Sequence, residues 1–169
     1  MRCEMRRSTL QGRAVLVVDD VRAMRAIVRS LLLNMGATQI IEAADGAEAL
    51  DKLQASRVEL VVTDLNMSPM SGIEFTQKLR MPGSKFHSAV PILMVSGHRE
   101  VGLVKAAIQA GTNEFMVKPF TPGDFEARIC SIFGNPRPVV SSESYHGPDR
   151  RRRAIPVRKD RRDATVLDL

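Results

Sequence analysis

Carboxylate, hydroxyl and amino side chains stand at the ends of four short apolar runs of this sequence. In chain order they are Asp19 and Asp20, Asp64, Ser96 and Lys118. Three carboxylates held close together repel one another, and a bound cation such as Mg²⁺ relieves that repulsion. A carboxylate can also attack phosphorus, while a metal ion, an amino group and a hydroxyl neutralise the transferred phosphoryl group. An isolated Asp at a strand end is more often a turn former, but the complete set predicts phosphoryl chemistry centred on Asp64.

The elements that would position these residues alternate between strand and helix. Runs rich in Val, Leu and Ile predict strands over residues 13–18, 39–43, 60–64, 90–95 and 114–118. Apolar residues at helical spacing follow each run. Five alternations call for parallel strands joined by right-handed crossovers, which predicts a doubly wound α/β domain. In such a sheet the ligand site lies beyond the carboxyl ends of the strands, where the polar residues stand.

Charge is distributed unevenly along the 169 residues, whose net charge is +6. Residues 12–134 contain thirteen basic and thirteen acidic side chains, whereas residues 1–11 carry +2 and residues 135–169 carry +4. With 44% apolar residues the chain can build one core. We therefore expect a flexible leader at 1–11, one domain at 12–134 and a disordered, Arg-rich tail at 135–169, which has too few regularly spaced apolar residues for a second core.

Membrane-spanning and disulfide-stabilised classes are disfavoured by the sequence. The apolar stretch at 14–18 is far shorter than a signal peptide core or the roughly 20 residues of a membrane span. Cys3 and Cys130 lie too far apart in sequence to suggest a disulfide framework or a metal-ligand set. The tail shows no helix-turn-helix, zinc-finger or catalytic pattern. A cytoplasmic protein is the expectation.

The ordered set of strand-end residues resembles the receiver domain of two-component response regulators, over about residues 12–134. The residues that match the family pattern are Asp19-Asp20, Asp64, Ser96-Gly97 and Lys118-Pro119-Phe120, which follow the first, third, fourth and fifth strands. The chain is most similar to stand-alone, chemotaxis-type receivers. The resemblance implies a flavodoxin-like, five-stranded parallel sheet of order 2-1-3-4-5 with helices on both faces.

The resemblance also implies a role for each acidic residue. Asp64 would accept a phosphoryl group from a histidine kinase or a histidine phosphotransfer protein. Asp20, Asp64 and the backbone carbonyl of Asn66 would bind Mg²⁺, and Asp19 would act mainly through a metal-bound water. Asn66 and His98 flank the site, so we expect their side chains to influence the lifetime of the phosphoryl group.

Further implied roles concern the switch between two states. Ser96 and Phe115 would be the switch pair, with the hydroxyl moving to the phosphoryl group as the ring turns inward. Ser stands here in place of the commoner Thr, and Phe in place of the commoner Tyr. Lys118 would contact the phosphoryl group, and a cis peptide would join it to Pro119.

The expected function is a phospho-accepting signalling switch that catalyses only its own phosphorylation and dephosphorylation. It would signal by binding an output protein through the face formed by the helix after the fourth strand and by the fifth strand. One alternative is a phosphorelay intermediate that passes the phosphoryl group to another histidine. A second is a regulator whose basic tail contacts nucleic acid, and a third, a scaffold without phosphorylation, is disfavoured by the intact acidic set.

Overall fold

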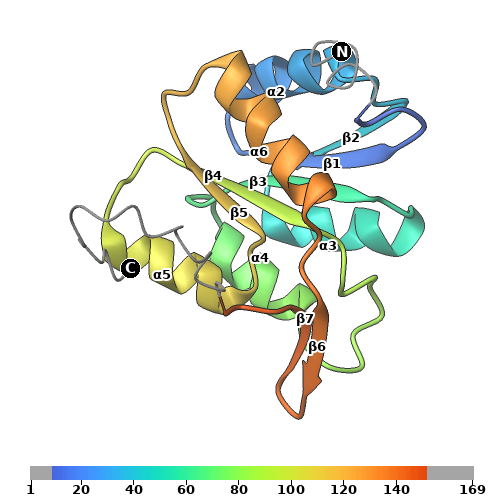
Figure 1. Cartoon of the computed structure of the whole chain (residues 1–169), viewed down its shortest axis with the longest axis vertical. Helices are drawn as coiled ribbons and strands as arrows, with labels where there is room; N and C mark the ends of the chain where they lie inside the picture. The colour runs from blue at the N-terminus through green and yellow to red at the C-terminus, as the bar shows by residue number, and fades with distance from the viewer. Residues whose placement is uncertain (1–8, 152–169) are drawn as a thin grey trace, which may run out of the picture.

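The computed structural model describes residues 9–151, which form an α/β domain with a small hairpin at its C-terminal end (Figure 1). One parallel sheet has the order β2-β1-β3-β4-β5. Its strands are β1 (Ala14–Val18), β2 (Gln39–Ala43), β3 (Leu60–Asp64), β4 (Ile92–Ser96) and β5 (Glu114–Val117). The helices are α2 (Arg22–Asn34), α3 (Gly46–Ala55), α4 (Gly72–Leu79), α5 (Val101–Ala110) and α6 (Pro122–Gly134). This arrangement confirms the predicted flavodoxin-like fold and strand order.

The sheet lies between two layers of helices, with α2 and α6 on one face and α3, α4 and α5 on the other (Figure 1). Every residue of β3 and β4 is buried, as expected for parallel strands covered on both faces. Each fully buried Val, Leu or Ile contributes about 1.5–3 kcal/mol to folding before chain entropy is subtracted. Within residues 9–151, no helix is long and apolar enough to cross a membrane.

Local signals in the sequence place the helix ends. Ser71 and Glu74 form a reciprocal capping box at the start of α4, which satisfies backbone donors that the first turn leaves open. Thr121 and Asp124 do the same for α6, where Pro122 occupies the first turn. At the end of α5 Gly111 adopts φ +108°, a conformation that glycine accepts without strain.

The end of the predicted flexible leader belongs to the folded domain. Leu10 is fully buried in the core next to α2, and its backbone N–H donates to the carbonyl of Met35 at 3.1 Å. Gln11 forms an antiparallel bridge with Ala37. The expected boundary at residue 12 is therefore wrong by at least three residues, because an isolated apolar residue gives no periodic signal. Residues 1–8 of the predicted leader lie outside the described part of the chain.

The first half of the predicted disordered tail is also ordered. Strands β6 (Val139–Ser142) and β7 (Tyr145–Pro148) form an antiparallel hairpin. Tyr145 is buried, and its hydroxyl donates to the carbonyl of Pro148 at 2.7 Å. The prediction of disorder is wrong here because the hairpin gains its apolar contacts from the domain and needs no second core. Residues 152–169, with most of the arginines, lie outside the described part.

Arg80 connects this hairpin to the domain. It is 1% exposed, and its guanidinium donates to several neutral carbonyl oxygens. These acceptors are the backbone oxygens of Ser88, Val90 and Gly111 and the side-chain oxygen of Asn113. Its own carbonyl accepts from the backbone N–H of His146 at 2.8 Å. Burial lowers the pKa of Arg80 to about 10, so the guanidinium stays charged at neutral pH.

We expect Arg80→Met to lower the free energy of unfolding by about 3 kcal/mol, because buried carbonyl oxygens lose their donors. Urea denaturation can be followed by the emission of Tyr145, since the chain has one Tyr and no Trp. Lys78→Met, at an exposed position in the last turn of α4 just before Arg80, is the matched control and should change stability little. A stability equal to wild type in Arg80→Met would show that Arg80 is not needed to hold these segments together.

Candidate functional site at the carboxyl edge of the sheet

Parallel pairing brings the predicted strand-end residues to one edge of the sheet. Asp64 is the last residue of β3 and lies beside Val95 of β4, and Ser96 lies beside Val117 of β5. The backbone N–H of Lys118 donates to the carbonyl of Ser96 at 2.7 Å. The carboxyl ends of three neighbouring strands therefore position Asp64, Ser96 and Lys118 together, as the sequence predicted.

The amino group of Lys118 joins two buried carboxylates. Its Nζ lies 2.6 Å from Oδ1 of Asp64 and 3.0 Å from Oδ2 of Asp19. Asp64 is 7% exposed and Asp19 is 5% exposed. Two buried carboxylates thus share one ammonium group, so the cluster holds more negative than positive charge.

The electrostatics of the cluster reflect this imbalance. Burial raises the pKa of the Asp64 carboxyl, and the hydrogen bond and charge of Lys118 offset only part of that shift. Asp19 adds to it, because two like charges disfavour ionisation. Burial lowers the pKa of Lys118, but its hydrogen bonds to Asp64 and Asp19 outweigh burial, and the net shift is upward. Asp64 is therefore a carboxylate that gains from any further positive charge placed beside it.

The structure places the expected metal ligands unequally. Oδ1 of Asp19 accepts from the backbone N–H of Val21 at 2.8 Å, and Oδ2 of Asp64 accepts from that of Asn66 at 2.7 Å. Asp20 is exposed on the loop after β1. Over residues 9–151, no three Asp, Glu, His or Cys side chains are placed to hold a metal ion together. Lys118 thus joins Asp19 and Asp64, and Asp20 takes no part in that ion pair.

The two residues expected to act as a switch are both buried. Ser96 is fully buried, and its Oγ accepts from the backbone N–H of His98 at 3.0 Å. Phe115 is 8% exposed and packs with Met94 of β4 and Ala107 of α5. The ring is therefore already turned into the domain, where a phenylalanine has no hydroxyl to desolvate. The peptide between Lys118 and Pro119 is cis, as the resemblance implied.

Asn66 and His98 form a bridge beside the site. Nδ2 of Asn66 lies 2.8 Å from Nδ1 of His98, and both side chains are exposed. The bond links the loop after β3 to the loop after β4. The sequence placed both residues near Asp64, but only the structure shows that they contact each other.

Gly72 is a site residue that the sequence analysis did not single out. A Cβ at this position would lie inside van der Waals contact of the carbonyl oxygen of Asp64, and the Gly72 N–H donates to Leu65 at 2.9 Å. The start of α4 can approach Asp64 this closely only because residue 72 has no side chain. In the sequence, the sign of this close approach is the glycine itself, which directly follows Ser71.

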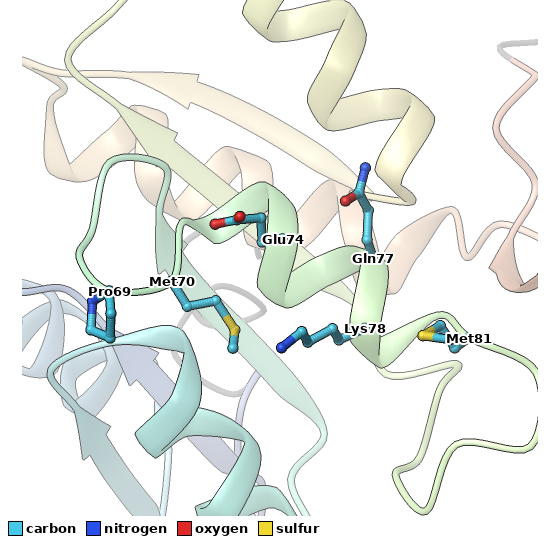
Figure 2. Close-up of a pocket in the computed structure, with 6 residues that line it drawn as sticks. All are labelled: Pro69, Met70, Glu74, Gln77, Lys78 and Met81. Atoms are coloured by element: carbon cyan, nitrogen blue, oxygen red, sulfur yellow. The ribbon is translucent and has the colours of Figure 1, made fainter.

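A separate pocket of about 320 Å³ lies on the outer side of α4 (Figure 2). Its lining residues are Pro69, Met70, Glu74, Gln77, Lys78 and Met81. Figure 2 shows the Met70 sulfur turned toward the ammonium end of Lys78. None of the clustered groups at the sheet edge lines this pocket, so we place the functional site at Asp64.

A family model described as the response regulator receiver domain matches residues 15–130. The chain belongs to the response regulator receiver family. The match ends before the hairpin of β6 and β7.

Relatives of the chain include chemotaxis proteins. It is 38% identical over 119 residues to the chemotaxis protein CheY of Pseudomonas aeruginosa, an alignment covering 70% of this chain and 94% of that protein. It is 36% identical over 121 residues to a CheY homolog of Campylobacter jejuni, covering 71% and 92% of the two chains. Among solved structures, the CheX-CheY-BeF3-Mg²⁺ complex of Borrelia burgdorferi contains a similar chain at 27% identity and a TM-score of 0.66, covering 73% of this chain and 90% of that one.

We expect Asp64→Asn to stabilise the protein at neutral pH by about 1 kcal/mol, or roughly 2–4 °C in Tm. A carboxyl whose pKa is raised on folding favours its protonated form, and Asn imitates that form. The gain in stability should be complete at a pH above the pKa that Asp64 has in the folded protein. It should vanish as the pH falls below about 4, where Asp is protonated in the unfolded chain as well. Thermal unfolding in EDTA tests this.

Asp51→Asn, at an exposed position of α3, is the control and should leave Tm unchanged at every pH. A lower Tm for Asp64→Asn at neutral pH would mean that Lys118 compensates the buried charge of Asp64 fully.

Proposed function

We propose that this chain is a cytoplasmic phospho-accepting receiver in which Asp64 takes a phosphoryl group from a histidine kinase or a histidine phosphotransfer protein. The observation that carries the proposal is the position of Lys118, whose ammonium group contacts both Asp64 and Asp19 at the edge of the sheet. Receiver domains as a family interact with histidine kinases and output partners. Phosphorylation would then alter partner binding.

Transfer of the phosphoryl group to Asp64 depends mainly on the correct placement of the reacting groups. A carboxylate oxygen of Asp64 attacks phosphorus, the phosphorus–nitrogen bond of the phosphohistidine breaks, and its electron pair stays on the imidazole. Lys118 neutralises charge on the phosphoryl oxygens, and the hydroxyl of Ser96 can donate to one of them. The phosphorylated side chain carries more negative charge than the free carboxylate, so the positive charge of Lys118 beside Asp64 stabilises the product as well.

The chemistry of the donors at this edge suits a Mg²⁺ ion, which the related complex from Borrelia burgdorferi contains. The donors are all oxygens, and the cluster has an excess of negative charge with Lys118 as its counterion. Asp20, Asp64 and the backbone carbonyl of Asn66 would hold the ion, and Asp19 would contribute through water. The ion would supply positive charge to the transferring phosphoryl group.

The output face that we propose includes α5 and β5. Val101 at the start of α5 is 57% exposed, and Leu103 and Val104 are half-buried against Phe115 and its neighbours. Because Leu103 and Val104 pack with Phe115, an output protein bound at this face would respond to the position of the ring. The nucleic-acid alternative depends mainly on arginines after residue 151, outside the described part of the chain.

Incubation with acetyl phosphate and Mg²⁺ should add one phosphoryl group, visible in the intact mass, and Asp64→Asn should remove the adduct. Omitting Mg²⁺, or changing Asp20 to Ala, should slow the reaction by about tenfold or more, as loss of a metal ligand or its support does elsewhere. Asp51→Asn is the matched control and should react like wild type. An equal adduct in Asp64→Asn would move the acceptor to another residue.

The bridge between Asn66 and His98 should slow hydrolysis of the phosphoryl group, since it restricts the approach of water to Asp64. We expect His98→Ala and Asn66→Ala each to shorten the lifetime several-fold without preventing phosphorylation. Because each change breaks the same hydrogen bond, the double variant should be no faster than the singles. His87→Ala, at an exposed loop position, is the control. Unchanged lifetimes in both single variants would exclude the bridge as a barrier to water.

A further inference from the structure

The C-terminal hairpin has one protected strand and one open strand. Strand β7 lies against the domain, where Tyr145 and Gly147 are buried. Every residue of β6 is exposed, including Val139 at 50% and Val140 at 36%. Figure 1 shows the hairpin projecting from the body of the domain. An uncharged, exposed strand of this kind at a sheet edge is a template for pairing with another strand.

Hydrogen bonds around the hairpin show which backbone groups of β6 face outward. The N–H of His146 donates to the carbonyl of Arg80, so it points away from β6. Ser141 is opposite His146 in the register, and this pair is therefore a non-hydrogen-bonded one. It follows that the N–H and C=O groups of Ser141, and those of Val139 two residues earlier, point away from β7.

A second bond supports the same alternation. The N–H of Asp149 donates to the carbonyl of Pro138 at 2.8 Å. Pro138 thus faces β7, as alternation requires for a residue next to Val139. The outer edge of β6 consequently offers two sets of backbone donors and acceptors, at Val139 and Ser141.

We propose that this edge pairs antiparallel with the same edge of a second copy of the chain. The two-fold axis would pass beside Val140, so that Val139 of each copy lies opposite Ser141 of the other. Both of these pairs use outward-facing groups and can exchange two hydrogen bonds each. The two hairpins would form one four-stranded antiparallel sheet with an isologous interface.

Charge complementarity favours a second copy of the chain as the partner of β6, and it favours this register of the two strands. With the axis at Val140, Arg137 lies opposite Glu143 of the second copy, and symmetry repeats the pair. Glu143 is exposed, and the contact of Arg137 Nη1 with the carbonyl of Asp149 is long, at 3.4 Å. Registers displaced by two residues keep the backbone bonds but place Arg137 opposite Ser141 or Tyr145. Only the proposed register turns the charged ends of the strand into attractive pairs.

The association should be weak, because two four-residue strands bury much less than the roughly 1,200 Å² of a standard interface. Sedimentation of the full chain over a range of concentrations should show a reversible dimer. Glu143→Arg should weaken it by about tenfold or more, since like charges then oppose each other. The double variant Arg137→Glu with Glu143→Arg should restore the wild-type dimer constant to within about threefold, because it reverses both partners.

Ser141→Pro supplies an independent arm. It removes an outward backbone N–H without removing a backbone hydrogen bond of the hairpin, and of the hairpin's side-chain bonds only that of Ser141 Oγ with His146 Nδ1 is lost, so dimerisation should be lost. The emission of Tyr145 must stay as in wild type in each variant, which shows that the hairpin remains docked. A chain that is monomeric at all concentrations would overturn the proposal, and so would a dimer that neither Glu143→Arg nor Ser141→Pro weakens. Failure of the double charge variant to restore the dimer would overturn the register.

Discussion

The ion pair that Lys118 makes with Asp64 and Asp19 is the constraint on which the functional edge of this molecule depends. Burying two carboxylates is costly, and a single ammonium group compensates it in part. Because Lys118 comes from the end of β5 and the carboxylates from β3 and β1, the pair also ties three strands together. A site that is short of positive charge is suited to bind a cation.

A second cation, the buried guanidinium of Arg80, organises the opposite end of the molecule. Arg80 donates to carbonyl oxygens of the segments that precede β4 and β5, and its own carbonyl accepts a hydrogen bond from His146 of the hairpin. Its partners are neutral dipoles, whereas those of Lys118 are charged. Arg150 extends this contact, since its guanidinium lies 4.0 Å above the ring of Tyr145 and donates to Gln109 at the end of α5. The hairpin is therefore attached to α5, one of the two elements of the proposed output face.

The sheet and most of the site could be predicted because both depend on local pattern. Continuous Val and Leu runs define buried parallel strands, and a polar residue at the end of such a run must lie at the carboxyl edge. The hairpin and Leu10 could not be found in this way, since strands of four residues and a lone leucine have no period. Arg80 was missed because nothing in the sequence distinguishes a buried arginine from one on the surface. The contact between Asn66 and His98 depends on side-chain geometry, which no spacing rule supplies.

The most direct test of the account is the titration of the Asp64 carboxyl by carbon-detected NMR in metal-free buffer, in wild type and in Lys118→Met. The account predicts a pKa above the ordinary Asp value of about 3.9 in wild type, and a still higher pKa in the variant, because the group that offsets burial is gone. A wild-type pKa at or below the ordinary value, or a pKa that Lys118→Met leaves unchanged, would contradict it.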